Sequence, residues 1–168
     1  MVPTALEDWT LDALRKLLAS GAFERDSFDF KWQLPHPKAK VDKKGLSTDC
    51  AAFANASGGF LVFGVKDDRT LSPDERLVGV DAEDFPAQFG NFPNECSPTV
   101  DWDFKTGGVA LPRGKLIHVV QIPKSWKAPH SVEPERGTFR FPKRTNKGTE
   151  YQACKRGRDG DVDHHSSN

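Results

Sequence analysis

The apolar positions between residues 49 and 68 change their period halfway along the stretch. Three of them are spaced as on one face of a helix: Cys50, Phe53 and Ala54. After Gly58-Gly59, residues 60–65 are almost continuously apolar, which predicts a short strand buried on both faces. The two glycines permit backbone angles that a side chain forbids, so they predict a tight corner between helix and strand. Asn55 could bond a substrate, and the favoured interpretation is that it fixes the corner by bonding nearby backbone.

Two patterns precede this stretch. After the candidate N-cap Thr10, four leucines lie on one predicted helical face: Leu11, Leu14, Leu17 and Leu18. In residues 28–32, three aromatic side chains alternate with Asp29 and Lys31, which is typical of a half-buried strand. The alternation predicts that Asp29 and Lys31 share the face opposite the aromatic side chains.

After the Gly58-Gly59 corner, most of the predicted elements are short strands. Apolar runs predict strands at residues 100–104, 116–122, 130–132 and 138–141. Residues 142–149 are expected to form a basic loop. This order indicates an α+β fold, a single domain with a mixed or mostly antiparallel sheet and helices mainly on one face. We expect a flexible N-terminus over residues 1–9, the domain over 10–151 and a disordered polar tail over 152–168.

Composition narrows the classes of function. The 168 residues carry 24 basic and 24 acidic side chains, so only a local patch could bind a polyanion. No apolar run approaches the roughly 20 residues that span a bilayer, and no signal peptide is evident, so no membrane partner is expected. Cys50, Cys96 and Cys154 lie far apart, which favours a reducing cytoplasm over a disulfide framework or a paired-cysteine metal site.

Several segments together resemble the Schlafen AlbA-type domain family, which is described as DNA-binding. The specific match is A-F-A-N-A-S-G-G-F-L-V-F-G-V over residues 52–65. The supporting matches are Glu24 with Asp29-Phe30-Lys31, Asp67-Asp68, Ile122-Pro123, Ala128-Pro129 and Phe139-Arg140-Phe141. The resemblance covers residues 10–150 and implies contact with DNA or RNA in regulation or defence. Because some Schlafen proteins cut RNA with three acidic residues, it also implies metal-assisted cleavage.

The acidic candidates for catalysis are Glu24, Asp29, Asp67 and Asp68. Converging carboxylates suit Mg²⁺ or Mn²⁺, with Glu24, Asp29 and Asp67 as the metal ligands. The alternative is that Glu24 and Asp29 are solvated or paired with Lys31, while Asp67-Asp68 belong to a turn. Asp29 stands where the family more commonly has Glu. Schlafen nucleases use a doubled core, so a single copy predicts that a clamp around nucleic acid needs a homodimer.

The candidate nucleic-acid contacts are Lys31, Arg140, Lys143, Arg144, Asn146 and Lys147. Lys and Arg bind phosphate through charge and release counterions, and Asn adds neutral hydrogen bonds. The alternative is a solvated loop that is balanced by Glu133, Glu135 and Glu150. Trp126, in a predicted loop, is the aromatic candidate for base stacking.

Three functions therefore stay open. The first is a nucleic-acid-binding domain with a basic surface loop. The second is a metal-dependent endoribonuclease that uses the carboxylate trio. The third is a protein-interaction scaffold without nucleic-acid activity. The first two require that residues 29–31, 67–68 and 140–147 meet at one rim of the molecule.

Overall fold

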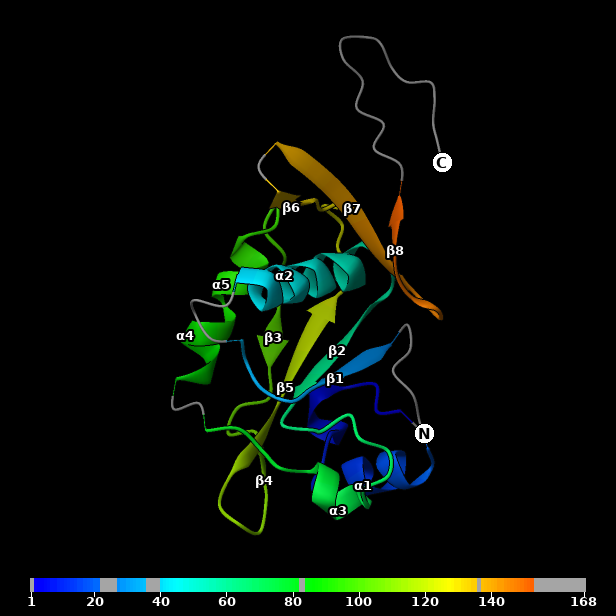
Figure 1. Cartoon of the computed structure of the whole chain (residues 1–168), viewed down its shortest axis with the longest axis vertical. Helices are drawn as coiled ribbons and strands as arrows, with labels where there is room; N and C mark the ends of the chain where they lie inside the picture. The colour runs from blue at the N-terminus through cyan, green and yellow to red at the C-terminus, as the bar shows by residue number, and fades with distance from the viewer. Residues whose placement is uncertain (1, 22–26, 36–39, 82–83, 136, 153–168) are drawn as a thin grey trace, which may run out of the picture.

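Two β-sheets form the frame of the protein in a computed structural model, which describes residues 2–21, 27–35, 40–81, 84–135 and 137–152 (Figure 1). The first sheet has the order β1-β2-β5-β3, and β4 also pairs with β5. Its strands are β1 (Phe28–Lys31), β2 (Gly58–Phe63), β3 (Asp103–Phe104), β4 (Val109–Ala110) and β5 (Leu116–Pro123). The second sheet consists of β6 (Val132–Glu135), β7 (Thr138–Thr145) and β8 (Gly148–Gln152).

The pairing in the first sheet is mixed. β1 runs parallel to β2, with Lys31 opposite Phe63, and β2 runs antiparallel to β5, with Gly58 opposite Pro123. The carboxyl ends of β1 and β2 therefore meet at one edge of the sheet, and the start of β2 meets the end of β5 at the other. The predicted α+β class is confirmed, with one parallel pair in an otherwise antiparallel sheet.

Helices cover both faces of this sheet. α2 (Lys40–Asn55), α4 (Phe85–Phe89) and α5 (Asn91–Asn94) pack with Leu61 and Phe63 of β2. α1 (Leu11–Ala19) packs on the other face with Phe60 and Val62, so helices are not confined to one face. The short elements η1 (Leu6–Asp8) and α3 (Pro73–Arg76) complete the helices of the described residues.

The expected flexible N-terminus is wrong for the residues next to α1. Trp9 is fully buried, and its ring packs against Phe28 and Phe60 with centroid distances of 6.4 and 5.2 Å. The sequence pattern missed this contact because a lone Trp before a helix has no period. Thr10 does cap α1, since its side chain accepts a hydrogen bond from the Ala13 amide.

The glycine corner has a steric cause at each position. A Cβ on Gly58 would lie 2.6 Å from the Ile122 carbonyl oxygen, and the residue has a φ of +81°. A Cβ on Gly59 would lie 2.4 Å from the Phe53 ring. The close approach of β2 to β5 and to α2 therefore depends on the absence of side chains at both positions.

The expected basic loop over residues 142–149 is instead most of a β-hairpin. β7 continues to Thr145, a turn at Asn146-Lys147 follows, and β8 begins at Gly148, which has a φ of +108°. An exposed hairpin needs little apolar alternation, so the polar sequence concealed the strands. Gln152, expected in the tail, ends β8, and residues 153–168 lie outside the described residues.

Candidate nucleic-acid interface

Four charged side chains form a cluster where β1, α2 and β7 meet. The Lys31 ammonium lies 2.5 Å from Asp49 Oδ2 and 3.4 Å from Asp29 Oδ2. Arg144 Nη1 lies 3.2 Å from the same Asp29 oxygen, and the guanidinium carbon lies 5.0 Å from the centre of the Phe53 ring. Two acids and two cations therefore balance one another beneath β7. Asp49 is the member that sequence reasoning missed, because its partners come from other elements.

The cluster is largely removed from solvent. The side chains of Asp29 and Arg144 are 9% and 7% exposed. Burial acts to lower the pKa of Lys31, but the negative charges of Asp49 and Asp29 outweigh it and raise that pKa. Lys31 is therefore charged at every physiological pH. Removing one member would leave an uncompensated charge in this buried setting.

The cluster changes the role of two predicted phosphate contacts. Lys31 and Arg144 are engaged by Asp29 and Asp49, whereas the sequence placed them on the binding surface. The alternative interpretation, which paired Asp29 with Lys31, matches the observed contact. We therefore assign Lys31 and Arg144 to the anchoring of β1 and β7.

The remaining predicted contacts lie on the hairpin, and we call Arg140, Lys143, Asn146 and Lys147 the hairpin surface. Arg140, Asn146 and Lys147 are exposed, and Lys143 is partly exposed. Lys143 lies opposite Glu150 in the β7–β8 pairing, so one acid sits beside the cations. Lys147 donates its backbone N–H to the Thr145 hydroxyl at 3.1 Å, which orders the turn.

Asn55, at the end of α2, clamps two distant segments rather than the nearby corner. Its side-chain amide donates to the carbonyl oxygens of His130 at 2.9 Å and Pro142 at 2.7 Å. Its side-chain oxygen accepts the His130 N–H at 2.6 Å. The preceding residue, Ala54, accepts a hydrogen bond from the Ser125 N–H at 3.0 Å. The last turn of α2 therefore fixes both β7 and the loop between β5 and β6.

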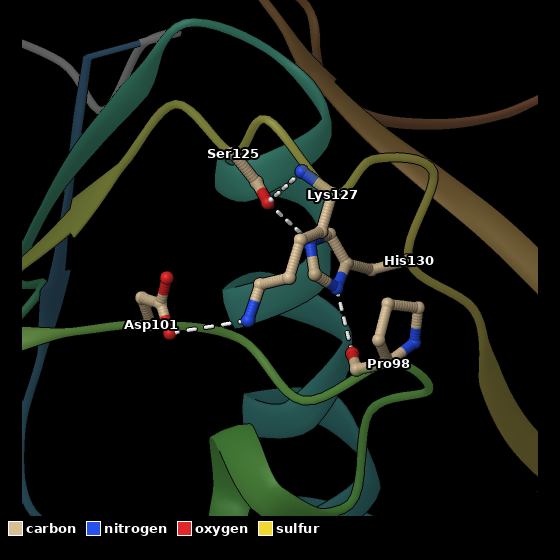
Figure 2. A network of polar contacts seen from close by, with 5 residues as sticks. All are labelled: Pro98, Asp101, Ser125, Lys127 and His130. Atoms are coloured by element: carbon tan, nitrogen blue, oxygen red, sulfur yellow. Dashed lines mark hydrogen bonds and ion pairs between the residues drawn. The ribbon is translucent and has the colours of Figure 1, made fainter.

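Figure 2 shows the polar contacts that close this loop. The buried His130 ring lies between the Pro98 carbonyl oxygen and the Ser125 hydroxyl, with both contacts at 2.6 Å. A carbonyl oxygen only accepts, so Nδ1 donates to Pro98, and in the neutral ring Nε2 accepts from Ser125. The Lys127 N–H donates to the same hydroxyl at 3.0 Å. Sequence reasoning missed this network because isolated Ser and His residues carry no spacing signal.

The described acidic residues do not fit a carboxylate-trio metal site. Asp29 Oδ2, which a metal would need, already contacts Lys31 and Arg144. Asp68 accepts hydrogen bonds from the Thr70 N–H and hydroxyl, as in a turn, and Asp67 is exposed. Within the described ranges, no three His, Cys, Asp or Glu side chains are grouped so that they could hold a metal ion. Glu24 lies outside those ranges, so a trio that includes it stays a prediction.

Among the helices that the structure describes, none is long and apolar enough to cross a bilayer.

Comparison with known proteins gives the family. The chain is similar in structure to part of the DIP2311 protein from Corynebacterium diphtheriae, with a TM-score of 0.50 and 17% identity. The match covers 82% of this chain but 25% of that protein, so the chain spans about a quarter of its length, and the likeness shows the fold alone. No curated protein matches the chain. The family model described as Schlafen, AlbA_2 matches residues 24–152. This match covers most of the chain, which therefore belongs to the Schlafen AlbA_2 family.

Proposed function

We propose that this protein binds nucleic acid, DNA or RNA, through the hairpin surface. Membership of the Schlafen AlbA_2 family supports nucleic-acid binding in general. The particular support for this surface is its set of exposed cations at the β7–β8 hairpin. A regulatory role, a cytoplasmic setting and assembly as a homodimer belong to the same proposal and rest on the sequence arguments.

The observation that carries the proposal is the opposite placement of neighbouring cations on β7. Arg144 is buried and paired with Asp29, whereas its neighbour Lys143 is partly exposed, and Lys147, in the turn after β7, is exposed. Successive side chains of a strand point to opposite faces, so Lys143 lies on the face of β7 opposite the buried Arg144. Arg140 shares the face of Arg144, but it is exposed nearer the start of the strand. A protein that is neutral overall then presents positive charge on an ordered element.

An acidic side chain reduces the positive charge of the hairpin. Glu150, the acid opposite Lys143, contacts the Thr145 hydroxyl at 3.2 Å. This contact holds the carboxylate beside the hairpin, so its charge offsets part of the positive field. We therefore expect weak to moderate affinity that depends strongly on salt, as for other interfaces dominated by phosphate.

The test is fluorescence anisotropy with labelled single-stranded DNA, duplex DNA and single-stranded RNA at about 50 mM salt, where phosphate contacts are strong. The Lys143→Glu, Lys147→Glu variant should lose most of the affinity. The matched control is Arg113→Glu, Lys115→Glu, which reverses two exposed cations where β5 begins, at the end remote from the α2–β7 contact. This control should bind as the wild type does. Equal binding by both variants, or no binding by the wild type, would reject the proposal and favour a scaffold role.

A further inference from the structure

Exposed aromatic rings with a cation close to the ring recur on the surface of this protein. Within the described ranges, these rings are Trp32 (56% exposed), Trp126 (87%) and Tyr151 (51%), with Lys66, Lys127 and Arg140 within 6.0 Å of the respective ring centroids. Trp126 is the most exposed of them. We infer that Trp126 stacks on an unpaired base, so that the ligand of the hairpin surface is a single strand. This inference rests on the proposed nucleic-acid binding.

The loop that carries Trp126 is fixed on both sides of the ring. Ser125, directly before it, donates its N–H to Ala54, and its hydroxyl contacts the His130 ring (Figure 2). Lys127, directly after it, donates its N–H to Ser125, and its ammonium lies 3.3 Å from Asp101. The polar groups around Trp126 thus hold an exposed indole on an ordered backbone. A backbone fixed in this way loses little conformational freedom when a ligand binds.

The loop lies beside the hairpin surface. Ala54 and Asn55, consecutive residues at the end of α2, bind Ser125 and Pro142 respectively. Pro142 is opposite Tyr151 in the β7–β8 pairing, and the Arg140 guanidinium lies 5.2 Å from the Tyr151 ring centroid. Trp126 and Tyr151 therefore flank the end of α2, and the cations of the hairpin extend from there.

The chemistry of the ligand follows from this combination. In a duplex, the faces of the bases are covered by their neighbours, so an indole on the protein surface cannot stack on them. In a single strand the faces are accessible, and aromatic rings beside cations bind them with little regard to sequence. A chain of phosphates also matches the positive charge of the hairpin, which an apolar peptide would not.

The test is anisotropy with a labelled oligonucleotide of about 16 nucleotides, the upper end of site sizes for single-strand binding folds. Trp126→Ala should weaken single-strand binding between about 5-fold and about 150-fold, the range for losing one stacked base, and Trp126→Phe should retain most of it. Binding to the matching duplex should be weaker in the wild type and unchanged by Trp126→Ala. Thermal unfolding should be unaffected, because the ring is 87% exposed.

The matched control is Trp32→Ala. Trp32 is also exposed beside a lysine, but it follows Lys31 at the edge of the sheet opposite Pro123 and the Trp126 loop, so its removal should not weaken single-strand binding as Trp126→Ala does. If the charge-reversed hairpin fails to bind while Trp126→Ala binds normally, this inference is wrong and the proposed function stands. If Trp126→Ala weakens duplex and single-strand binding equally, the inference is also wrong. If the wild type binds neither, both proposals fall.

Discussion

Arg144 and Asp29 form an ion pair across 115 positions of sequence, with Nη1 3.2 Å from Oδ2. The pair joins β7, in the small sheet, to β1, in the large one. It lies next to the Lys31–Asp49 contact and beneath α2, whose Phe53 ring contacts the guanidinium. The hairpin is therefore an integral part of the fold, and its surface has a fixed position relative to the rest of the domain.

The pair predicts a large decrease in stability when Asp29 is removed. Asp29→Ala leaves Lys31 with one partner fewer and Arg144 without this carboxylate, so it should lower the free energy of unfolding by about 3–5 kcal/mol. Asp67→Ala, which removes an exposed carboxylate of the same predicted trio, should leave the unfolding midpoint unchanged. Urea denaturation followed by circular dichroism measures both. A stable Asp29→Ala protein would show that the cluster contributes little to folding.

The same variants bear on the endoribonuclease hypothesis. If the two aspartates served a metal, both substitutions should abolish Mn²⁺-dependent cleavage of labelled RNA. Because Asp29 contacts two cations and Asp67 is exposed, we expect no cleavage by the wild type that depends on either residue. Cleavage that disappears in Asp67→Ala while the protein stays folded would restore the metal hypothesis.

The clamp at Asn55 predicts a second sensitive position. Asn55→Ala removes three hydrogen bonds, leaves buried backbone groups unpaired, and should cost about 2–4 kcal/mol of folding free energy. Asn55→Asp keeps the acceptor for the His130 N–H but turns an oxygen toward two carbonyl groups. It should therefore be nearly as harmful, and a wild-type melting temperature for Asn55→Asp would contradict the assigned geometry.

Two glycines of the same region should respond in opposite directions to alanine. Gly59→Ala places a Cβ 2.4 Å from the Phe53 ring and 2.8 Å from the Ser27 carbonyl oxygen, so it should destabilise the protein strongly. Gly45, within α2, has no atom within 4 Å of an added Cβ. Gly45→Ala should stabilise the protein by about 0.5–1 kcal/mol through helix propensity. Thermal melts of the two variants, with shifts of opposite sign, check this contrast.

His118 predicts a dependence of stability on pH. The residue is 8% exposed, and its ring stacks on Phe85 with a centroid distance of 4.2 Å. Neither ring nitrogen has a hydrogen-bond partner among the described residues. Burial lowers its pKa below the unfolded value near 6.5. The unfolded state therefore binds the proton more tightly than the folded state does. The contribution of His118 to the free energy of unfolding is complete above the unfolded pKa and declines as the pH falls below it.

The measurement is urea denaturation of the wild type and of His118→Phe at about pH 7.5 and about pH 5, on either side of the unfolded pKa. Phe keeps the stack on Phe85 and removes the titration. The wild type should lose more stability than the variant between these conditions. If the free energy of unfolding decreased equally in the wild type and in His118→Phe, His118 would take up a proton as easily in the folded protein as in the unfolded chain.

The sequence predicted the elements that have strong apolar periods. The Cys50 to Ala54 face, the run after Gly58-Gly59 and the alternation around Asp29 each correspond to a packed element of the structure. These segments can be predicted because burial forces their pattern locally. The same alternation correctly placed Asp29 and Lys31 on one face of β1.

The contacts that define the candidate site were less accessible from sequence. Asp49, Asn55 and His130 act on partners that the chain brings near only after folding, so no local pattern marks them. The sequence predicts the same role for Arg144 as for its basic neighbours, because charge alone does not distinguish a buried cation from a surface one. The hairpin itself was hidden by its polar composition, since a strand exposed on one face needs few apolar residues.

The salt dependence of binding tests the central claim most directly. Each phosphate that the protein no longer neutralises should make the slope of log K against log salt concentration shallower by about 0.7 for a single strand or about 0.9 for a duplex. Neutralising two cations in Lys143→Gln, Lys147→Gln should therefore reduce the slope by about 1.4 with single-stranded DNA. The control Arg113→Gln, Lys115→Gln should leave it unchanged. A slope that is the same in the wild type and the hairpin variant would contradict binding through this surface.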